Sequence, residues 1–495
     1  MGGSFAGVLC RQVHSWRVAQ ASIMKAATTV DVGSPSRLAQ LAGIPILVCI
    51  AVSVAILFSG INRPLWKDEV LHFAIGGYGS TQDAWRVIVR SLETINFNQT
   101  GVYMLVDYWL LQAFGASAVW LRMPSSIGAL VLFSGAVCVL RTRGFGYAWQ
   151  IAVVLLLVTQ TFLMQFVAEA RPYMLLAATS VGVLAYYGAD GHGRHWFICV
   201  LGWLSALVGA AMHPYFLPYY ILVVGLTYVD RISWNLRRIT AKDIWQHLQP
   251  AVLFSTLAVY FGVGMLTWMP RQPQLAFDPF QWLPRPWPYR VISFHFEFLF
   301  GSAGGTHPRA MLLFLAVLML LFLAALGAIA ILTLARSNCR SLLSPLALIF
   351  GALLLSGLLS LMSYRAHYWI LPRQWVASIA LACVGTVWLC AAAAELLPVG
   401  ARRGAGIAVA IFATFRAEPA VVAQFQAIDR WRTEQSTIAL NAGHVSLDQI
   451  KPAGWSPSWL GLKGEFAGYA KWVALANQNV LVGGPVWPIF QKFYQ

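Results

Sequence analysis

The sequence is short of charged residues. Asp, Glu, Lys and Arg together make up 11% of the 495 residues, whereas 59% of the chain is hydrophobic. A water-soluble protein of this length keeps much of its surface in contact with water, and so few charged side chains cannot cover that surface. The composition therefore excludes a soluble globular domain. It predicts an all-α, polytopic membrane protein, because apolar runs long enough to cross a hydrocarbon core recur along the chain.

Acidic residues and cysteines are also scarce. The chain has 18 acidic residues against 34 Lys and Arg, which gives a formal net charge of +16. Many of the basic residues lie in short loops between apolar runs and form no stripe, so they indicate membrane topology and not nucleic-acid binding. The seven cysteines include no C-x-x-C spacing. We therefore predict neither a disulfide framework nor a zinc site, and no nucleic-acid partner.

The order of basic and apolar segments predicts the topology. Residues 1–40 contain scattered basic residues and no early apolar segment, so they are expected to form a cytosolic N-terminal tail. The first span, 41–60, then leads outward. Residues 81–97 have the pattern of a helix on the membrane surface. Residues 102–114 are too short to span, so we predict a second interfacial helix in this outer loop. About eleven spans are predicted in all, namely 41–60, 123–140, 147–166, 173–188, 196–212, 215–229, 251–269, 310–335, 345–363, 374–394 and 405–420.

Charge is concentrated at the predicted outer ends of the spans and is nearly absent from their centres. This distribution argues against an ion-coupled transporter, which keeps ionisable groups near the membrane midplane. The densest cluster is the stretch 62–73, directly after the first span, where Asp68 and Glu69 are adjacent. Adjacent carboxylates point in different directions, so one can act as a base while the other holds Lys67, Arg63 or a backbone N–H. The alternative is an ordinary polar loop after a span.

Three ordered blocks resemble those of GT-C glycosyltransferases of the protein O-mannosyltransferase and aminoarabinose transferase type. Leu65-Trp66-Lys67-Asp68-Glu69 is similar to the W-x-D-E signature of that group, and Leu121-Arg122-Met123-Pro124-Ser125 to its L-R-L-P-S block. Glu169-Ala170-Arg171-Pro172-Tyr173 resembles its E-A-R-P-Y loop, and the stretch 364–372 more loosely resembles a late R-Y-x-x-x-P element. The resemblance covers most of residues 40–395. The chain departs from it at 99–102, where Gln-Thr-Gly-Val stands in place of H-P-P-L or K-P-P-L.

The resemblance implies an enzyme that transfers a hexosyl or pentosyl group from a polyprenyl-phosphate donor, with inversion, on the exoplasmic face. Residues 41–420 would be the transmembrane catalytic domain, and 421–495 a small exoplasmic C-terminal segment. Asp68 is the expected base, with Glu69 supporting it. Cations are needed where charge develops on the leaving phosphate. The candidates for that role are Arg171, Arg365, His367, Arg373 and Lys67.

Each candidate also has a structural explanation. Arg171 and Glu169 could form an interfacial ion pair, and Arg365 and Arg373 could extend to lipid head groups. His213 precedes a proline and is typical of a helix end. Asp107 lies on an apolar helix, where a carboxylate must be paired or face water. The further site candidates are Glu169, Tyr173, Asp107 and His213.

Two other classes of function stay open at this point. A lipid or sugar-lipid transporter could use the same cations to bind a head group, and a non-catalytic GT-C-like scaffold would fit the departure at 99–102. For an enzyme, the expected partners are the lipid-linked donor, membrane lipids and a lipid, protein or glycan acceptor. We assign no metal ligands and leave a divalent cation open. The expected location is the bacterial inner membrane, with the N-terminus cytosolic and the site and C-terminus exoplasmic.

Overall fold

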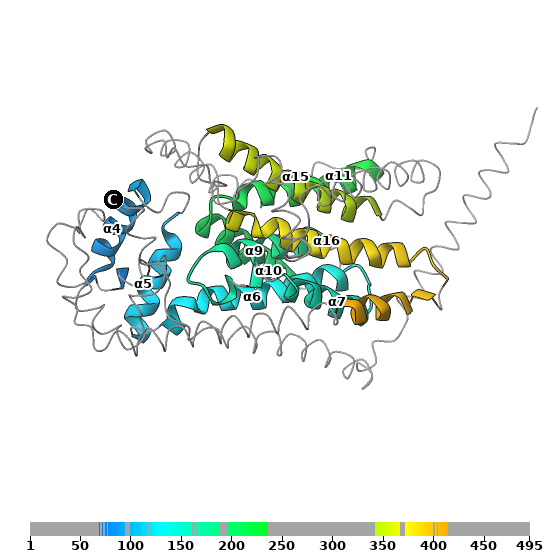
Figure 1. Cartoon of the computed structure of the whole chain (residues 1–495), viewed down its shortest axis with the longest axis horizontal. Helices are drawn as coiled ribbons and strands as arrows, with labels where there is room; N and C mark the ends of the chain where they lie inside the picture. Colours follow the sequence, from blue (N-terminus) through cyan, green and yellow to red (C-terminus); the bar gives the residue numbers. More distant parts are fainter. Residues whose placement is uncertain are drawn as a thin grey trace, which may run out of the picture. The chain divides into compact units, whose positions relative to one another are not determined.

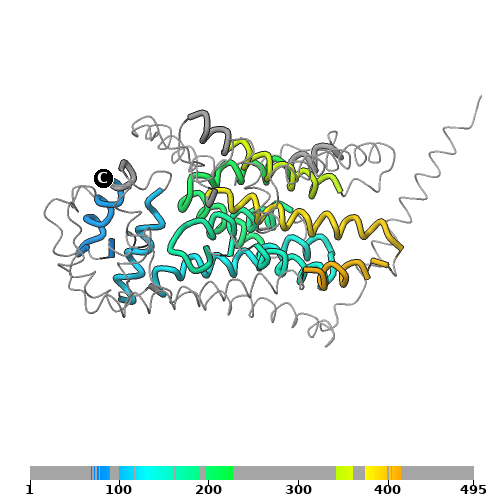
Figure 2. Tube along the Cα trace, in the orientation of Figure 1, coloured from blue at the N-terminus to red at the C-terminus, as the bar shows by residue number. Residues whose placement is uncertain are grey.

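The computed structural model describes about two fifths of the chain, and all regular secondary structure in that part is helical (Figures 1 and 2). The predicted tail 1–40, the spans 41–60, 251–269 and 310–335 and the segment 421–495 lie outside the described residues. The described residues are 69, 72, 75–76, 78–94, 100–115, 118–160, 163–164, 166–188, 196–235, 342–366, 372–398, 401–402 and 404–413.

The elements follow one another in the order that the apolar runs predict. Short connections of polar residues, Gly and Pro separate α6 from α7, α9 from α10 and α10 from α11, as expected for neighbouring antiparallel helices. The helices are α4 (Thr81–Thr94), α5 (Val102–Phe114), α6 (Ala118–Arg141), α7 (Tyr147–Val158), η1 (Phe166–Ala168), α9 (Tyr173–Gly188), α10 (Trp196–Met212), α11 (Phe216–Asn235), α15 (Leu343–Ala366), η4 (Pro372–Trp375) and α16 (Val376–Ala394).

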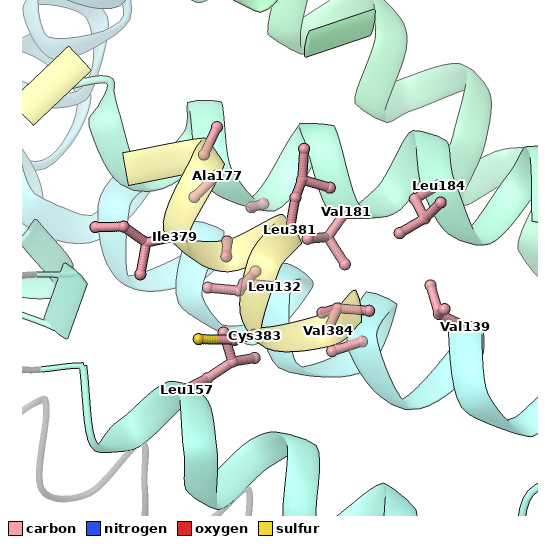
Figure 3. Packing of buried hydrophobic residues seen from close by; sticks show 14 of the residues in the cluster. Leu132, Val139, Leu157, Ala177, Val181, Leu184, Ile379, Leu381, Cys383 and Val384 are labelled. Carbon is pink, nitrogen blue, oxygen red and sulfur yellow. The ribbon is translucent and has the colours of Figure 1, made fainter. Parts of the chain in front are cut away.

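Helix α9 is the centre of the main hydrophobic core. It packs against α6, α10, α11 and α16, and nearly all of its residues are buried. A helix that is apolar on every side is expected to lie in the interior of a bundle. Figure 3 shows Val181 of α9 among side chains of α6 and α16, including Leu132 and Leu381. This core fixes the positions of the helix ends and loops that carry the polar residues.

Small residues allow α9 and α10 to approach closely. A Cβ atom added to Gly202 of α10 would collide with the Tyr186 side chain of α9, and one added to Gly182 would collide with Ser205. A Cβ atom added to Gly209 of α10 would likewise lie 2.5 Å from the ring of Phe216 on α11. Small residues at helix interfaces are typical of membrane bundles, where close backbone approach replaces the hydrophobic effect.

Two observations support the predicted membrane location. Within the described ranges, the segments Val119–Arg141 and Val376–Ala394 are long and apolar enough to cross a membrane. Helix α10 also exposes a row of large apolar side chains, which water would solvate poorly and lipid would solvate well. The exposed residues of this row are Trp196, Phe197, Val200, Trp203, Leu204 and Leu207.

A second, smaller core joins α4 and α5 to the helical residues that follow the first predicted span. Ile75 packs with Ile88 of α4 and Met104 of α5, and all three are buried. As predicted, α4 is amphipathic, and the side chains of Asp83 and Arg86 are 46% and 57% exposed. On this helix Ala84 is fully buried and Trp85 is 39% exposed.

The predicted helices 102–114, 173–188 and 196–212 coincide with α5, α9 and α10. Helix α6 begins before the predicted span 123–140 and includes Arg122, because this cation finds a buried partner there. The predicted span 147–166 is too long, since α7 ends at Val158. After it, Thr159 bonds the Leu156 carbonyl oxygen and competes with the helical ladder.

The remaining boundaries differ by a few residues. Helix α11 continues beyond the predicted span 215–229, and α15 extends the predicted 345–363 at both ends. Helix α16 starts two residues after the predicted start of 374–394, because η4 precedes it. Residues 404–413 are helical within the predicted 405–420. The total of eleven spans stays a prediction.

Candidate functional site

The carboxylate of Glu69 is the meeting point of the three sequence blocks. The Arg122 Nε atom donates to Glu69 Oε1 at 2.9 Å, and Arg122 Nη2 donates to Oε2 at 2.6 Å. The backbone N–H of Ala170 also donates to Oε1, at 2.7 Å. Glu69 and Arg122 are both fully buried, so this is a bidentate ion pair removed from water. It fixes residue 69 to the start of α6 and to the loop before α9.

The same end of α6 also holds the loop 166–171. The Ser125 hydroxyl donates to the Arg171 carbonyl oxygen at 2.9 Å, and the Ser126 hydroxyl donates to the Val167 carbonyl oxygen at 3.0 Å. This loop contains two residues of the predicted site, Glu169 and Arg171. Loop carbonyl groups that are buried need such partners. The second and third sequence blocks are therefore held together by side-chain to backbone hydrogen bonds.

A second buried polar pair lies one helical turn after Glu69. The Nδ1 atom of His72 and the Oδ2 atom of Asp107 are 2.6 Å apart, and both side chains are fully buried. Asp107 is on α5, which at 13 residues is about 20 Å long and too short to cross a membrane. Burial raises the pKa of Asp107 well above its usual value, and the charge of Glu69 raises it further, whereas Arg171 acts in the opposite direction. The pairing with His72 meets the condition for a carboxyl group on this apolar helix.

Tyr103 connects the two buried pairs. It lies one turn before Asp107 on α5, and the edge of its ring meets the ring of His72 with 5.7 Å between centroids. Its hydroxyl group and that of Ser125 are 2.9 Å apart. Burial, followed by the charge of Asp107, raises the pKa of Tyr103 well above its usual value, so it stays a neutral phenol. Tyr103 thus joins His72 to the α6 end that holds the loop before α9.

Two further site candidates, Tyr173 and His213, pack against each other. Their ring centroids are 5.6 Å apart, and both residues are buried. The Nδ1 atom of His213 accepts the backbone N–H of Tyr215 at 3.1 Å. This contact agrees with the structural explanation of His213 as a helix-end residue.

The stretch that departs from the family pattern is built around α5 and α10. Gly101 caps α5 with a φ of 78°, a left-handed conformation that glycine adopts without strain. The Thr100 hydroxyl donates to the Ala211 carbonyl oxygen at the end of α10 and accepts the N–H of Val102 at 3.3 Å. The sequence Gln-Thr-Gly-Val at 99–102 thus includes a buried anchor between two helices.

The structure therefore brings together part of the predicted site. Glu69 accepts the N–H of Ala170, and Ser125 holds the carbonyl oxygen of the adjacent Arg171. Asp107 pairs with His72 and lies close enough to Glu69 for that charge to raise its pKa, and Tyr173 and His213 pack on each other. Arg171 is itself buried, with a side chain close enough to Asp107 to influence its pKa. The predicted residues Lys67, Asp68 and His367, and the side chains of Arg365 and Arg373, lie outside the described part of the chain. Their roles stay predictions.

The sequence analysis did not assign a site role to Arg122, His72 or Tyr103. A signal existed for two of them. Arg122 is a cation at the head of a long apolar run, where a charge needs a partner. His72 follows Glu69 by three residues, which places both on one helical face. For Tyr103 only its spacing of four residues from Asp107 was available.

The network holds buried charges in fixed positions and is suited to orienting a neighbouring reactive group. Where side chains are described, His, Cys, Asp and Glu do not gather into a group of three that could hold a metal ion.

Comparison with known proteins gives a structural likeness at low identity. No protein-family model matches the chain. No curated protein matches it either. The apo structure of ArnT from Cupriavidus metallidurans is 14% identical, with a TM-score of 0.32 over 72% of this chain and 80% of that one. The ArnT structure from the same organism bound to undecaprenyl phosphate is also 14% identical, and it aligns with 89% of this chain and 90% of its own at a TM-score of 0.36.

Proposed function

We propose that this chain is a membrane glycosyltransferase that moves a sugar from a polyprenyl-phosphate donor to an acceptor on the exoplasmic face. One observation carries the proposal. The three sequence blocks that resemble GT-C enzymes, which are about 50 and 100 residues apart along the chain, meet at the Glu69 carboxylate. Sequence similarity alone gives no reason for these particular atoms to touch. A shared site does.

The proposed reaction is a single displacement. An acceptor oxygen attacks the anomeric carbon, and the bond between that carbon and the phosphate oxygen breaks. The electron pair leaves with the lipid phosphate, and the acceptor proton passes to Asp68. Glu69 does not react, because its two oxygen atoms are already committed to Arg122 and Ala170. Its role is to hold the residue next to Asp68 in place.

The leaving phosphate needs cations close to it, since negative charge grows there in the transition state. Arg171 is our first candidate, because Ser125 holds its backbone at the end of α6. We assign supporting roles to Lys67, Arg365, His367 and Arg373. The exposed apolar row of α10 provides the kind of surface that membrane lipid contacts.

The test is release of polyprenyl phosphate by the purified full-length protein in nanodiscs, with a panel of polyprenyl-phosphate sugars. The Asp68→Asn variant should lower the rate by at least about 100-fold, because general base catalysis typically contributes 10² to 10⁴. Asp83→Asn is the matched control, since Asp83 is an exposed carboxylate paired with Arg86 on α4 and should be dispensable. Full release by Asp68→Asn would refute the assigned base. Donor binding without release by the wild type would favour a transporter or a scaffold.

A further inference from the structure

The pair formed by His72 and Asp107 links two elements that are distant in the sequence. The contact spans 35 residues, from the helical residues Glu69, His72 and Ile75, here termed the 69–75 segment, to α5. Both side chains are fully buried, and their atoms are 2.6 Å apart. A short hydrogen bond between two buried side chains restricts how the 69–75 segment can rotate or slide on α5.

The contact requires one proton between the two side chains. A neutral imidazole nitrogen lone pair and a carboxylate would repel each other at this distance, whereas a shared proton makes a hydrogen bond. The surroundings favour keeping that proton. Burial and the nearby charge of Glu69 both raise the pKa of Asp107, with Arg171 opposing them. Among the described residues, the titratable or charged groups that act on the pair are Glu69 on the same segment as His72, Tyr103 on α5 and Arg171 before α9.

In the part of the chain that the structure describes, the hydrogen bond to His72 is the polar contact that explains the presence of Asp107. Among the described residues its Oδ1 atom is buried and accepts no hydrogen bond. A carboxyl group in an apolar environment with one oxygen unsatisfied costs stability. A leucine would suit the other buried neighbours on α5, such as Met104 and Leu111, much better. The role of Asp107 is therefore to hold His72 in place.

Two polar contacts consequently fix the 69–75 segment from different sides. Glu69 attaches it to α6 and to the loop before α9, and His72 attaches it to α5 one turn later. Without the His72 hydrogen bond, this end of the segment would rest on α4 and α5 through the apolar packing of Ile75, which resists sliding less than a directional polar contact does. We infer that Asp107 is a positioning residue for the proposed reaction, acting through His72 to complete the attachment of the segment that follows Asp68.

The test compares two near-isosteric variants in nanodiscs. Asp107→Asn keeps a hydrogen bond to His72 Nδ1, because its amide can donate to the imidazole. Asp107→Leu removes that bond and keeps the branched shape of the side chain. We expect Asp107→Leu to lower kcat for lipid phosphate release at least about 10-fold with the donor KM unchanged, since small misplacements of a reacting group are costly. Asp107→Asn should restore most of kcat. An unchanged kcat in Asp107→Leu would overturn the inference.

A matched variant separates positioning from loss of stability. Met104 is fully buried on the same helix and in the same small core, but it takes no part in the polar network. Met104→Ala should lower Tm and leave kcat intact at temperatures well below that Tm. An equal loss of kcat in Met104→Ala would reduce Asp107 to a packing residue. If Asp107→Leu does not fold, His72→Phe removes the same hydrogen bond from the other side and should give the same loss of kcat.

Hydrogen exchange does not depend on activity, so it tests the role of Asp107 even if the proposed function is wrong. Amide hydrogen exchange, followed by mass spectrometry on a peptide covering residues 69–76, should be faster in Asp107→Leu than in the wild type. Asp107→Asn should match the wild type. A wild-type protein that releases no lipid phosphate but shows this difference would refute the glycosyltransferase and keep the role of Asp107. Equal exchange in Asp107→Leu and the wild type would refute that role.

Discussion

The buried ion pair of Glu69 and Arg122 allows the sharpest test of the network. In Glu69→Gln the side chain keeps its shape but loses its charge. If the amide oxygen replaces Oε1, it still accepts from Arg122 Nε and from the Ala170 N–H, and the new NH₂ group then faces Arg122 Nη2 at a distance of 2.6 Å in the wild type. Two donors face each other there, and a buried cation loses the carboxylate beside it.

Breaking a buried pair from one side costs about 3–5 kcal/mol, because it leaves an uncompensated charge. This corresponds to a shift of roughly a few hundred to a few thousand fold in the unfolding equilibrium. Arg122→Met should cost a similar amount for the same reason. The double variant removes both charges together, so its cost should fall below the sum of the single costs by at least about 2 kcal/mol.

The assay is equilibrium unfolding of the purified protein in mixed detergent micelles, as a double-mutant cycle. A surface pair supplies the control. Arg402 Nη1 and Glu395 Oε2 are also 2.6 Å apart, but their side chains are 38% and 53% exposed. Solvent screens that pair, so Glu395→Gln and Arg402→Met should each cost under about 1 kcal/mol. If the costs at Glu69 and Arg122 simply add, or match those of the surface pair, the proposed attachment is refuted.

Two further predictions concern packing and pH. Gly202→Leu should destabilise the protein by about 1–3 kcal/mol, because a side chain at this position meets Tyr186 of α9. Gly225→Ala on α11 should be neutral or slightly stabilising, because no atom lies within 4 Å of the added Cβ. Equal melting temperatures for the two variants would contradict the close approach of α9 and α10. Because burial raises the pKa of Asp107 in the folded protein, its contribution to stability is complete below the unfolded carboxyl pKa of about 4 and is lost as pH rises toward the folded value. The Tm of the wild type should therefore fall relative to that of Asp107→Asn as pH increases above about 4, and parallel Tm curves would show that Asp107 holds no such proton.

Much of the helical layout followed from hydropathy alone. The predicted segments 102–114, 173–188 and 196–212 are bounded by glycine, proline or polar residues, and they coincide with α5, α9 and α10. Where a predicted helix boundary was wrong, a tertiary contact or a local hydrogen bond was the cause. Arg122 is helical because Glu69 neutralises it, and α7 stops where Thr159 and Gln160 bond to each other and to the helix end.

The sequence predicted which residues belong to the site but not which of them pair. The sequence pointed to Glu69, to the block around Arg122 and to Asp107, because charges in an apolar chain need partners. It suggested Lys67, Arg63 or a backbone N–H as the group that Glu69 holds. The structure shows the N–H of Ala170 and, in addition, Arg122.

Composition and hydropathy by themselves determined the helical class, the membrane environment and the segments that carry charge, because these depend on local transfer of side chains between water and lipid. Only the tertiary structure decided which charges meet. Pairs such as Glu69 with Arg122 and His72 with Asp107 lie 53 and 35 residues apart. Their contact depends on how α5 and α6 pack against the 69–75 segment, and no local pattern along the chain encodes that geometry.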